Sequence, residues 1–465
     1  MYKLISIVLA ALVATGCGPR TENTANAEPA NAAPPKGYAF HNVNVVHLTK
    51  DDAEITAGQT VVVVGDRITA VADTAAITVP ADYVHVDGTN KYIMAGMAEM
   101  HGHVPPANGL GQFPDRYLDD VLFLYAANGV TTVRGMLGYP HQLQLKQDIA
   151  AGKRIGPTLY LAGPSFNGNS IESPEQATQR VIDQRSEGWD LLKVHPGLTM
   201  AEYQAMATTA NNANMDFGGH VPSDVGLEAA LAAGQRTIDH LDGYLEAIDA
   251  TDRPASRYEL EYLVDLSLRH DVAVVPTQAL WATIIGASDA DTLRAYPELV
   301  YVPQSVRDGW LGYLNEPTLG YFNATNAAVQ QDNRQRLVKA LFDGGVPMIF
   351  GTDAPQLFSV PGFSALHEIR MLRDAGIPVA GILHSATVAA GDYFADRDSF
   401  GKIAEGQRAD FLLLGANPLI NPEVIRSHHG VMVAGKWLSR EAIDARLQEI
   451  RQAYAEPSAE PVQQP

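Results

Sequence analysis

Two histidines, His101 and His103, follow an apolar run of residues 93–100. Residues two apart on a β-strand point to the same face, so both imidazoles would face one site. Imidazole nitrogen is a common ligand for zinc and related metals. The pair is therefore a candidate metal site, although a single His-x-His is a weak signal by itself.

Four more polar residues each end an apolar, strand-like run: Lys193, His220, His240 and Asp353. Taken singly, each is explained more simply as a helix cap, a core histidine or a lysine whose head group reaches solvent. Together with the histidine pair, their shared position at strand ends is improbable by chance. The pattern predicts one polar site built from several strands.

Cysteine cannot contribute to that site. The chain has one cysteine, Cys17, so no internal disulfide and no cysteine-rich zinc cluster can form. Any metal must then be held by histidine, carboxylate or lysine. Such nitrogen and oxygen donors suit zinc, with manganese and cobalt as alternatives.

The elements that would position these residues alternate between apolar strand-like runs and helical stretches over residues 93–395. This alternation predicts βαβ units, a parallel sheet and hence an α/β fold. Eight strands would close a (β/α)8 TIM barrel, which keeps its chemistry at the carboxyl ends of the strands. The runs end near His103, Arg134, Ala162, His195, His220, His240, Pro276 and Asp353.

Short β-branched runs flank this region on both sides. Residues 37–92 contain strand-like runs joined by Gly65-Asp66, a turn signal, and similar runs return within residues 396–440. We expect both segments to form one small β-sandwich domain beside the barrel. Residues 441–465 are expected to form a C-terminal helix and a disordered tail.

The segment 280–341 is long for a single connection between a strand and a helix. A helical lid or pocket wall and a packing insertion on the flank of the barrel are equally compatible with it. Its aromatic residues are Trp281, Tyr296, Tyr301, Trp310, Tyr313, Tyr321 and Phe322.

Over residues 38–440 the chain resembles the amidohydrolase superfamily, especially its prolidase-like and imidazolonepropionase-like members. The resemblance lies in residues 91–97 leading to His101 and His103, and in residues 128–134, 192–194, His220, Asp239-His240, 351–353 and 401–410. One departure is Gly135, where members often have an aspartate after the arginine.

The resemblance implies two divalent metal ions, zinc in the first place. His101, His103 and Asp353 would bind one ion, and His220 and His240 the other. Lys193, carbamylated by CO₂, would bridge both. Metal binding would turn water into a hydroxide nucleophile, and Asp353 would act as general acid and base.

The implied activity is hydrolysis of the C–N amide bond of a small molecule, namely a dipeptide or an N-acyl amino acid. A cyclic-amide or lactone hydrolase with the same centre is the alternative. A mononuclear deaminase gives Lys193 no role. A binding protein with a structural metal site is a further class. Candidate substrate-binding residues are Arg134, His195, Asn167 and His141, and for the last three a structural or rim role is the simpler interpretation.

The formal net charge of −20 argues against a nucleic-acid partner, because phosphate binding requires a basic surface. The sequence leaves the substrate, the metal and the oligomeric state open.

The N-terminus has the pattern of an export signal. Lys3 precedes a short apolar run, and residues 14–17 read Ala-Thr-Gly-Cys, which resembles a bacterial lipobox. We expect a signal peptide over residues 1–16, lipidation of Cys17 and a flexible tether over residues 17–36. The protein would then be exported and anchored by lipid to the membrane of the bacterial cell envelope. An ordinary secretory signal with an incidental cysteine is the alternative.

Overall fold

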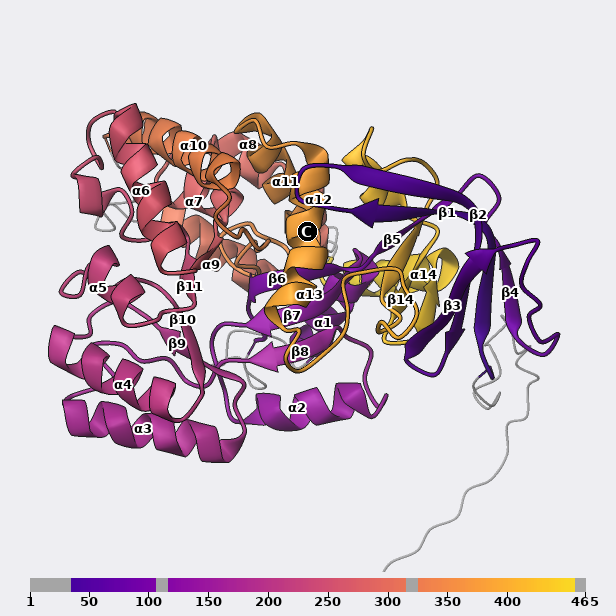
Figure 1. Ribbon diagram of the computed structural model, residues 1–465, viewed down its shortest axis with the longest axis horizontal. Coiled ribbons are helices and arrows are strands. Elements are labelled where there is room, and N and C mark those ends of the chain that lie inside the picture. Colours follow the sequence, from indigo (N-terminus) through magenta and orange to yellow (C-terminus); the bar gives the residue numbers. More distant parts are fainter. Residues whose placement is uncertain (1–34, 106–115, 315–324, 456–465) are drawn as a thin grey trace, which may run out of the picture. The chain divides into compact units, whose positions relative to one another are not determined.

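The computed structural model describes residues 35–105, 116–314 and 325–455 (Figure 1). Its central strands are parallel and almost fully buried, as expected when both faces of a sheet are covered. They form two sheets, ordered β6-β7-β8 and β12-β11-β10-β9. The strands are β6 (Met97–Gly102), β7 (Val130–Gly135), β8 (Thr158–Leu161), β9 (Leu191–Val194), β10 (Asp216–Gly219), β11 (Thr237–Asp239) and β12 (Ala273–Val275).

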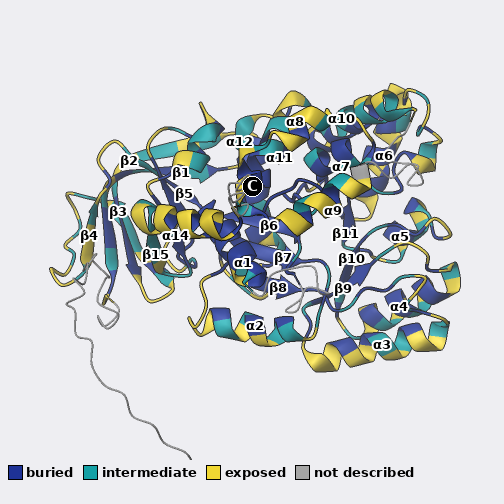
Figure 2. Cartoon of the chain, turned by 180° about the vertical axis from the view of Figure 1, so that it is seen from behind, coloured by how far each residue is buried: buried dark blue, intermediate teal, exposed yellow. Residues whose placement is uncertain are grey.

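A helix follows each strand from β6 to β11, which gives the predicted βα alternation. Figure 2 shows buried strands here, whereas α3 and α4 expose their outer faces. These helices are α1 (Tyr117–Ala127), α2 (His141–Ala150), α3 (Pro174–Glu187), α4 (Met200–Asn212), α5 (Leu227–Ala232) and α6 (Arg257–Arg269), with η1 (Glu246–Ile248) between β11 and α6.

Seven predicted strand ends lie within one residue of the observed ends. The prediction of a regular eighth strand ending at Asp353 is wrong for the described residues. Residues 347–354 instead make single backbone bonds, from Val274 N to Pro347 O (2.9 Å) and from Met100 N to Phe350 O (2.8 Å). Pro347 has no N–H to donate, and Asp353 has a φ of 62°. The arrangement is of the TIM-barrel type, with an additional sheet.

That additional sheet joins both ends of the described chain. Its eight strands run in the order β15-β14-β13-β5-β1-β2-β3, and β4 pairs with β1. The strands are β1 (Tyr38–Leu48), β2 (Ala53–Val64), β3 (Arg67–Asp73), β4 (Val84–Asp87), β5 (Tyr92–Ala95), β13 (Phe411–Leu414), β14 (Gly430–Val433) and β15 (Lys436–Ser439).

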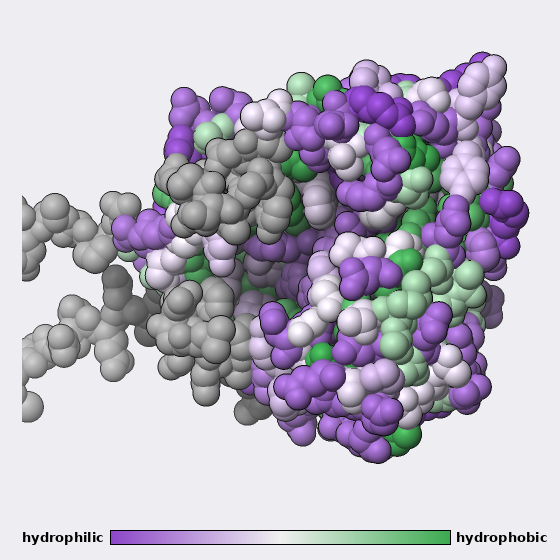
Figure 3. All heavy atoms as spheres, turned by 90° about the vertical axis from the view of Figure 1, so that its left-hand side faces the viewer, coloured by the Kyte–Doolittle hydropathy of each residue, from purple (hydrophilic) through white to green (hydrophobic). Residues whose placement is uncertain are grey.

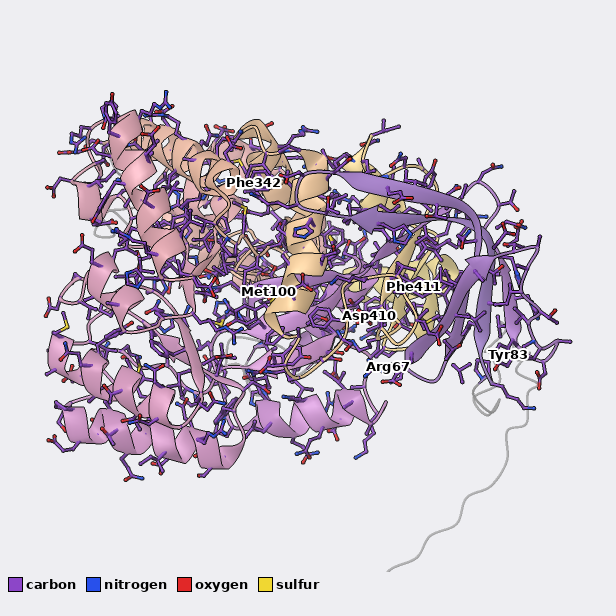
Figure 4. The ribbon with its side chains drawn as sticks, in the orientation of Figure 1. Arg67, Tyr83, Met100, Phe342, Asp410 and Phe411 are labelled. Carbon is purple, nitrogen blue, oxygen red and sulfur yellow. The ribbon has the colours of Figure 1, made fainter. Side chains whose placement is uncertain are left out.

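This sheet is rolled on itself, which corrects the expectation of a sandwich of two sheets. The ring centroids of Phe40 and Trp437 lie 4.9 Å apart, although three strands separate β1 from β15 in the sheet order. Ile68 N donates to Gln407 O (2.9 Å), so β3 meets the segment before β13. Figure 4 shows Arg67 near Asp410 and Phe411. Bulges in β1 allow one sheet to enclose its own apolar core.

The segment after β12 is helical. It comprises α7 (Gln278–Ile284), α8 (Ala290–Arg294), η2 (Pro297–Tyr301), α9 (Gln304–Leu314) and α10 (Ala327–Gly344), whereas Tyr321 and Phe322 lie outside the described residues. The later helices are α11 (Ser364–Asp374), α12 (Val379–Ala386), α13 (Val388–Tyr393), η3 (Pro422–Ser427) and α14 (Arg440–Ala453).

The predicted C-terminal helix corresponds to α14, which packs near α1. Asp120 of α1 accepts hydrogen bonds from Arg446 Nη2 (2.7 Å) and Tyr454 Oη (2.6 Å). The predicted signal peptide, Cys17 and most of the predicted tether lie outside the described residues. Within the described part of the chain, no helix has both the length and the apolarity of a membrane span.

Candidate active site

The predicted metal ligands meet at the carboxyl ends of the parallel strands. His101 is in β6 and Lys193 in β9, while His220 and His240 directly follow β10 and β11. Figure 3 shows the face on the left of Figure 1, where the surface is hollowed among hydrophilic and hydrophobic residues. The fold therefore gathers residues from distant parts of the sequence, as the strand-end pattern predicts.

His101, His103 and Asp353 form the tightest group. One ligand atom from each lies within 4.8 Å of the others. His103 Nε2 is 2.6 Å from Asp353 Oδ1, and His101 Nε2 is 3.7 Å from the same oxygen. His101 and Asp353 are buried, while His103 is partly exposed. Two imidazoles and one carboxylate suit a divalent transition metal.

Lys193 lies beside this group and is fully buried. Its Nζ is 3.2 Å from His101 Nε2. Burial lowers the pKa of Lys193 to about 8, because desolvation disfavours the ammonium form. The neutral amine is therefore accessible near neutral pH.

His240 and His220 extend the group. His240 Nε2 is 3.7 Å from Asp353 Oδ2. The ring centroids of His220 and His240 are 4.7 Å apart. Asp353 thus lies between His103 on one side and His240 on the other, and could contact ions on both sides.

The histidines are held through their Nδ1 atoms. Nδ1 lies 2.6 Å from Asp239 Oδ2 in His101 and 2.7 Å from Thr277 Oγ1 in His240. In His220, Nδ1 lies 3.2 Å from Asp242 Oδ2. Partners of this kind fix the tautomer and orientation of a metal-binding imidazole. Burial lowers the pKa of His101 and of His240 well below the usual value, so both rings stay neutral and leave Nε2 as a ligand.

Arg134 supports this arrangement through Asp239, which holds His101. Its predicted role in binding substrate does not fit the structure. Its side chain is fully buried. Nη2 is 3.2 Å from both Asp239 oxygens, Nη1 donates to Thr237 Oγ1 (3.1 Å) and Nε to Met100 O (2.5 Å). The guanidinium is thus occupied by protein groups and positions Asp239, which in turn holds His101.

Backbone strain is concentrated in the same place. Asp353, His240 and Thr277 have φ values of 62°, 65° and 45°. Non-glycine residues rarely adopt this left-handed conformation, and such strain tends to occur at functional sites. Contacts with the surrounding residues must therefore stabilise these three residues in a backbone conformation of higher free energy.

The other predicted substrate-binding residues differ in placement. His195 is partly buried and its ring stacks on His220 at 5.1 Å, so it stays a candidate. Asn167 holds its own loop, since its Nδ2 donates to Ser165 Oγ (2.9 Å) and its Oδ1 accepts from Asn169 N (2.9 Å). His141 lies 3.3 Å from Pro105 O, at the rim.

Several contributing residues were not assigned a role from sequence. Asp239 and Asp242 flank His240, so their spacing was an available signal. Thr277 gave none. Glu99 accepts hydrogen bonds from Thr352 N (2.7 Å) and His101 N (3.1 Å), and burial raises its pKa to about 8. It ties β6 to the segment that carries Asp353.

The sequence pattern of the Amidohydrolase family matches residues 92–438. No curated protein sequence matches the chain.

Solved structures share the fold. A bottromycin amidohydrolase is 24% identical with a TM-score of 0.70, and the match covers 90% of each chain. A candidate prolidase from Bifidobacterium longum is 22% identical with a TM-score of 0.66, over 90% of this chain and 99% of the other. An Xaa-Pro dipeptidase with methionine in its active site is 18% identical with a TM-score of 0.64, over 87% and 100%.

Proposed function

Since the chain belongs to the amidohydrolase family and is a hydrolase of C–N bonds, we propose that it cleaves the amide bond of a dipeptide or an N-acyl amino acid with the help of bound metal. The observation that carries the proposal is that Nε2 of His101 and Nε2 of His240 each lie 3.7 Å from an oxygen of the Asp353 carboxylate. Lys193 Nζ lies beside His101, 3.2 Å from its Nε2. The dipeptidase among its structural relatives supports the substrate class.

The residues present fit two divalent ions, zinc in the first place. His101, His103 and Asp353 would hold one ion, and His220 and His240 the other. When bound, such ions lower the pKa of water to about 7 and polarise the scissile carbonyl. Neutral imidazole nitrogens and carboxylate oxygens are donors that suit zinc, and one cysteine, Cys17, cannot form a cysteine-rich zinc cluster.

Lys193 would bridge the two ions as a carbamate. Its neutral amine would add to the carbon of CO₂, forming an N–C bond and releasing one proton, and the two oxygens of the product would share one negative charge. A buried ammonium 3.2 Å from His101 Nε2 would instead repel a metal cation bound there. Full burial of Lys193 supports the neutral amine that this reaction needs.

Asp353 would move the proton. Its oxygen Oδ1 lies near Nε2 of His103, in its own group of proposed ligands, and Oδ2 lies near Nε2 of His240, in the other group. The carboxylate would accept a proton from the attacking water and return it to the leaving nitrogen as the C–N bond breaks. Proton transfer of this kind contributes about 10²–10⁴-fold to the rate.

The proposal includes closure of the strands into one (β/α)8 barrel. It is supported by the parallel bridge between Ala162 and Leu191 and by the bonds that residues 347–354 make to β12 and β6.

Metal analysis combined with a substrate panel tests the activity. The protein is loaded with zinc, manganese or cobalt in bicarbonate buffer and offered dipeptides, N-acyl amino acids, a cyclic amide and a lactone. We expect two ions per chain and hydrolysis of the first two classes. If only the cyclic amide or the lactone is hydrolysed, the proposed substrate class is wrong and the alternative, a cyclic-amide or lactone hydrolase, takes its place. Binding of metal without any turnover would favour a structural site.

Lipid anchoring at Cys17 is part of the proposal and rests on the lipobox-like residues 14–17. We expect the wild-type protein in the membrane fraction and the Cys17→Ser variant outside it. Wild-type protein that is fully soluble without detergent would contradict the anchor.

A further inference from the structure

A pocket of about 280 Å³ adjoins the candidate active site on the side of His103. Its wall comes from loops at the carboxyl ends of the strands, including Val104 after β6, Leu137 after β7 and Pro355 after Asp353. Val306 and Trp310 of α9 complete it. At least this part of the 280–341 segment therefore forms a pocket wall.

The wall is mainly apolar and aromatic, and Gln356 adds one side-chain amide. Among the described residues that line it, His103 is the only one with a side chain that commonly ionises near neutral pH, and none is a carboxylate, a lysine or an arginine. Tyr117 and Tyr139 add aromatic surface. Trp310 and Val306 are each only 7% exposed, so their positions are fixed by packing.

We infer that this pocket binds one uncharged, bulky apolar or aromatic side group of the substrate, next to the amide that is cleaved. The inference rests on the proposed function, because it places the amide at the metal ligands. An apolar group gains free energy when it leaves water, whereas a charged group would lose its hydration without a partner.

The size and place of the pocket support a side group rather than a whole ligand. Small-molecule sites usually measure about 300–1,000 Å³, so this pocket is at the lower limit. His103 belongs both to the proposed metal ligands and to the wall. The group in the pocket would thus be attached close to the scissile bond.

Two series of dipeptides test the inference with the metal-loaded, full-length protein. In X-Ala and Ala-X, the residue X is Gly, Leu, Phe, Asp or Lys. We expect kcat/KM in one series to favour Phe and Leu over Asp and Lys by at least about 10-fold, since one methylene in an apolar pocket is worth about 10- to 200-fold. Equal rates for charged and apolar X in both series would overturn the inference and leave the proposed function intact.

Variants of the wall test it in a second way. Trp310→Ala should lower the ratio of kcat/KM for Phe over Gly by about 10-fold or more. Tyr313→Ala is the matched control, because Tyr313 is on the same helix, is 54% exposed and does not line the pocket. Leu137→Lys, at a half-buried position, should raise the relative rate with Asp. An unchanged preference in both wall variants would contradict the inference.

A binding measurement separates the two proposals if no dipeptide is cleaved. Calorimetric titration with N-acetyl-phenylalanine and N-acetyl-aspartate compares the two side groups without turnover. Tighter binding of the phenylalanine compound, weakened in Trp310→Ala, would support the pocket even though the proposed function failed. Equal binding of both compounds would overturn the pocket.

Discussion

Two buried arginine–aspartate pairs lie in different regions of the molecule. Arg134 and Asp239 are fully buried below the candidate active site. Arg408 and Asp410 are 4% and 1% exposed in the rolled sheet. The two pairs differ in the other contact that each carboxylate makes. Asp239 also holds His101, whereas Asp410 accepts from the backbone N of Ala434 (2.7 Å).

The comparison shows that the same kind of ion pair positions a proposed metal ligand in one region and holds strands together in the other. Arg408 also contacts Thr132 of β7, so its pair joins the rolled sheet to the parallel strands. Arg134 instead donates to Met100, Thr237 and Asp239 of the parallel strands, and it also lies over the ring of Tyr393 in α13. We therefore expect substitutions in the two regions to separate catalysis from stability.

The largest effect is expected for Asp353→Asn. Loss of the carboxylate that transfers protons should lower kcat by about 10²–10⁴-fold. The free energy of unfolding should change little, because the amide has nearly the same shape and the ion-pair partners of Asp353 are histidines rather than a permanently charged arginine. Steady-state kinetics, metal analysis and thermal unfolding measure the three quantities. Near-normal turnover with bound metal would remove Asp353 from the mechanism.

Asp410→Asn should have the opposite profile. Removing one partner of a buried ion pair typically costs about 3–5 kcal/mol of stability. We expect the lower end of this range, because Arg408 keeps Asp398 as a second carboxylate partner. The kcat per folded molecule should stay normal, since Asp410 contacts no proposed ligand. Denaturant unfolding and active-site titration measure the two effects. A loss of kcat in fully folded protein would show that the sheet region contributes to the chemistry.

Much of the site could be predicted from the sequence because apolar runs end abruptly in polar residues. This pattern predicted seven strand ends to within one residue. It also predicted that His101, Lys193, His220 and His240 lie together at the carboxyl ends of the strands. It could not predict the irregular path of residues 347–354, which depends on the left-handed backbone of Asp353.

The role of Arg134 was mispredicted for a related reason. The sequence shows an arginine at a strand end, but the direction of its side chain depends on Asp239, 105 residues further on. Likewise, the rolled sheet depends on pairing between distant segments. Such pairings leave no local pattern, so the sandwich was expected instead.

The third prediction concerns His428, a buried histidine outside the candidate active site. His428 donates from Nε2 to Ala127 O (2.8 Å), and burial lowers its pKa to about 4. Its stabilising effect is complete above the unfolded pKa of 6.5 and is lost as the pH falls toward 4, because the unfolded state binds the proton more readily.

The loss below pH 4 should reach about 3 kcal/mol, as one pKa unit corresponds to about 1.4 kcal/mol. His428→Gln keeps a donor for the Ala127 carbonyl and has no titration. The difference in unfolding free energy between the two proteins should therefore shift between pH 6.5 and 4. A constant difference across this range would contradict the assignment.

The smallest effect is expected for Asp239→Asn. This variant tests most directly whether the Arg134–Asp239 pair differs in function from the Arg408–Asp410 pair. An amide oxygen can still accept from His101 Nδ1, but it lacks the negative charge that both the imidazole and Arg134 face. Loss of such a supporting partner typically weakens metal affinity by about 10–100-fold.

Competition with a chelator measures that affinity directly, without reference to turnover. Asp410→Asn is the control, because it removes the same charge from the other buried pair and should leave the affinity unchanged at a temperature where both variants are folded. If Asp239→Asn binds metal as tightly as the control does, Asp239 stabilises the fold and nothing more. If only Asp239→Asn loses affinity, the two pairs differ because one of them acts through His101.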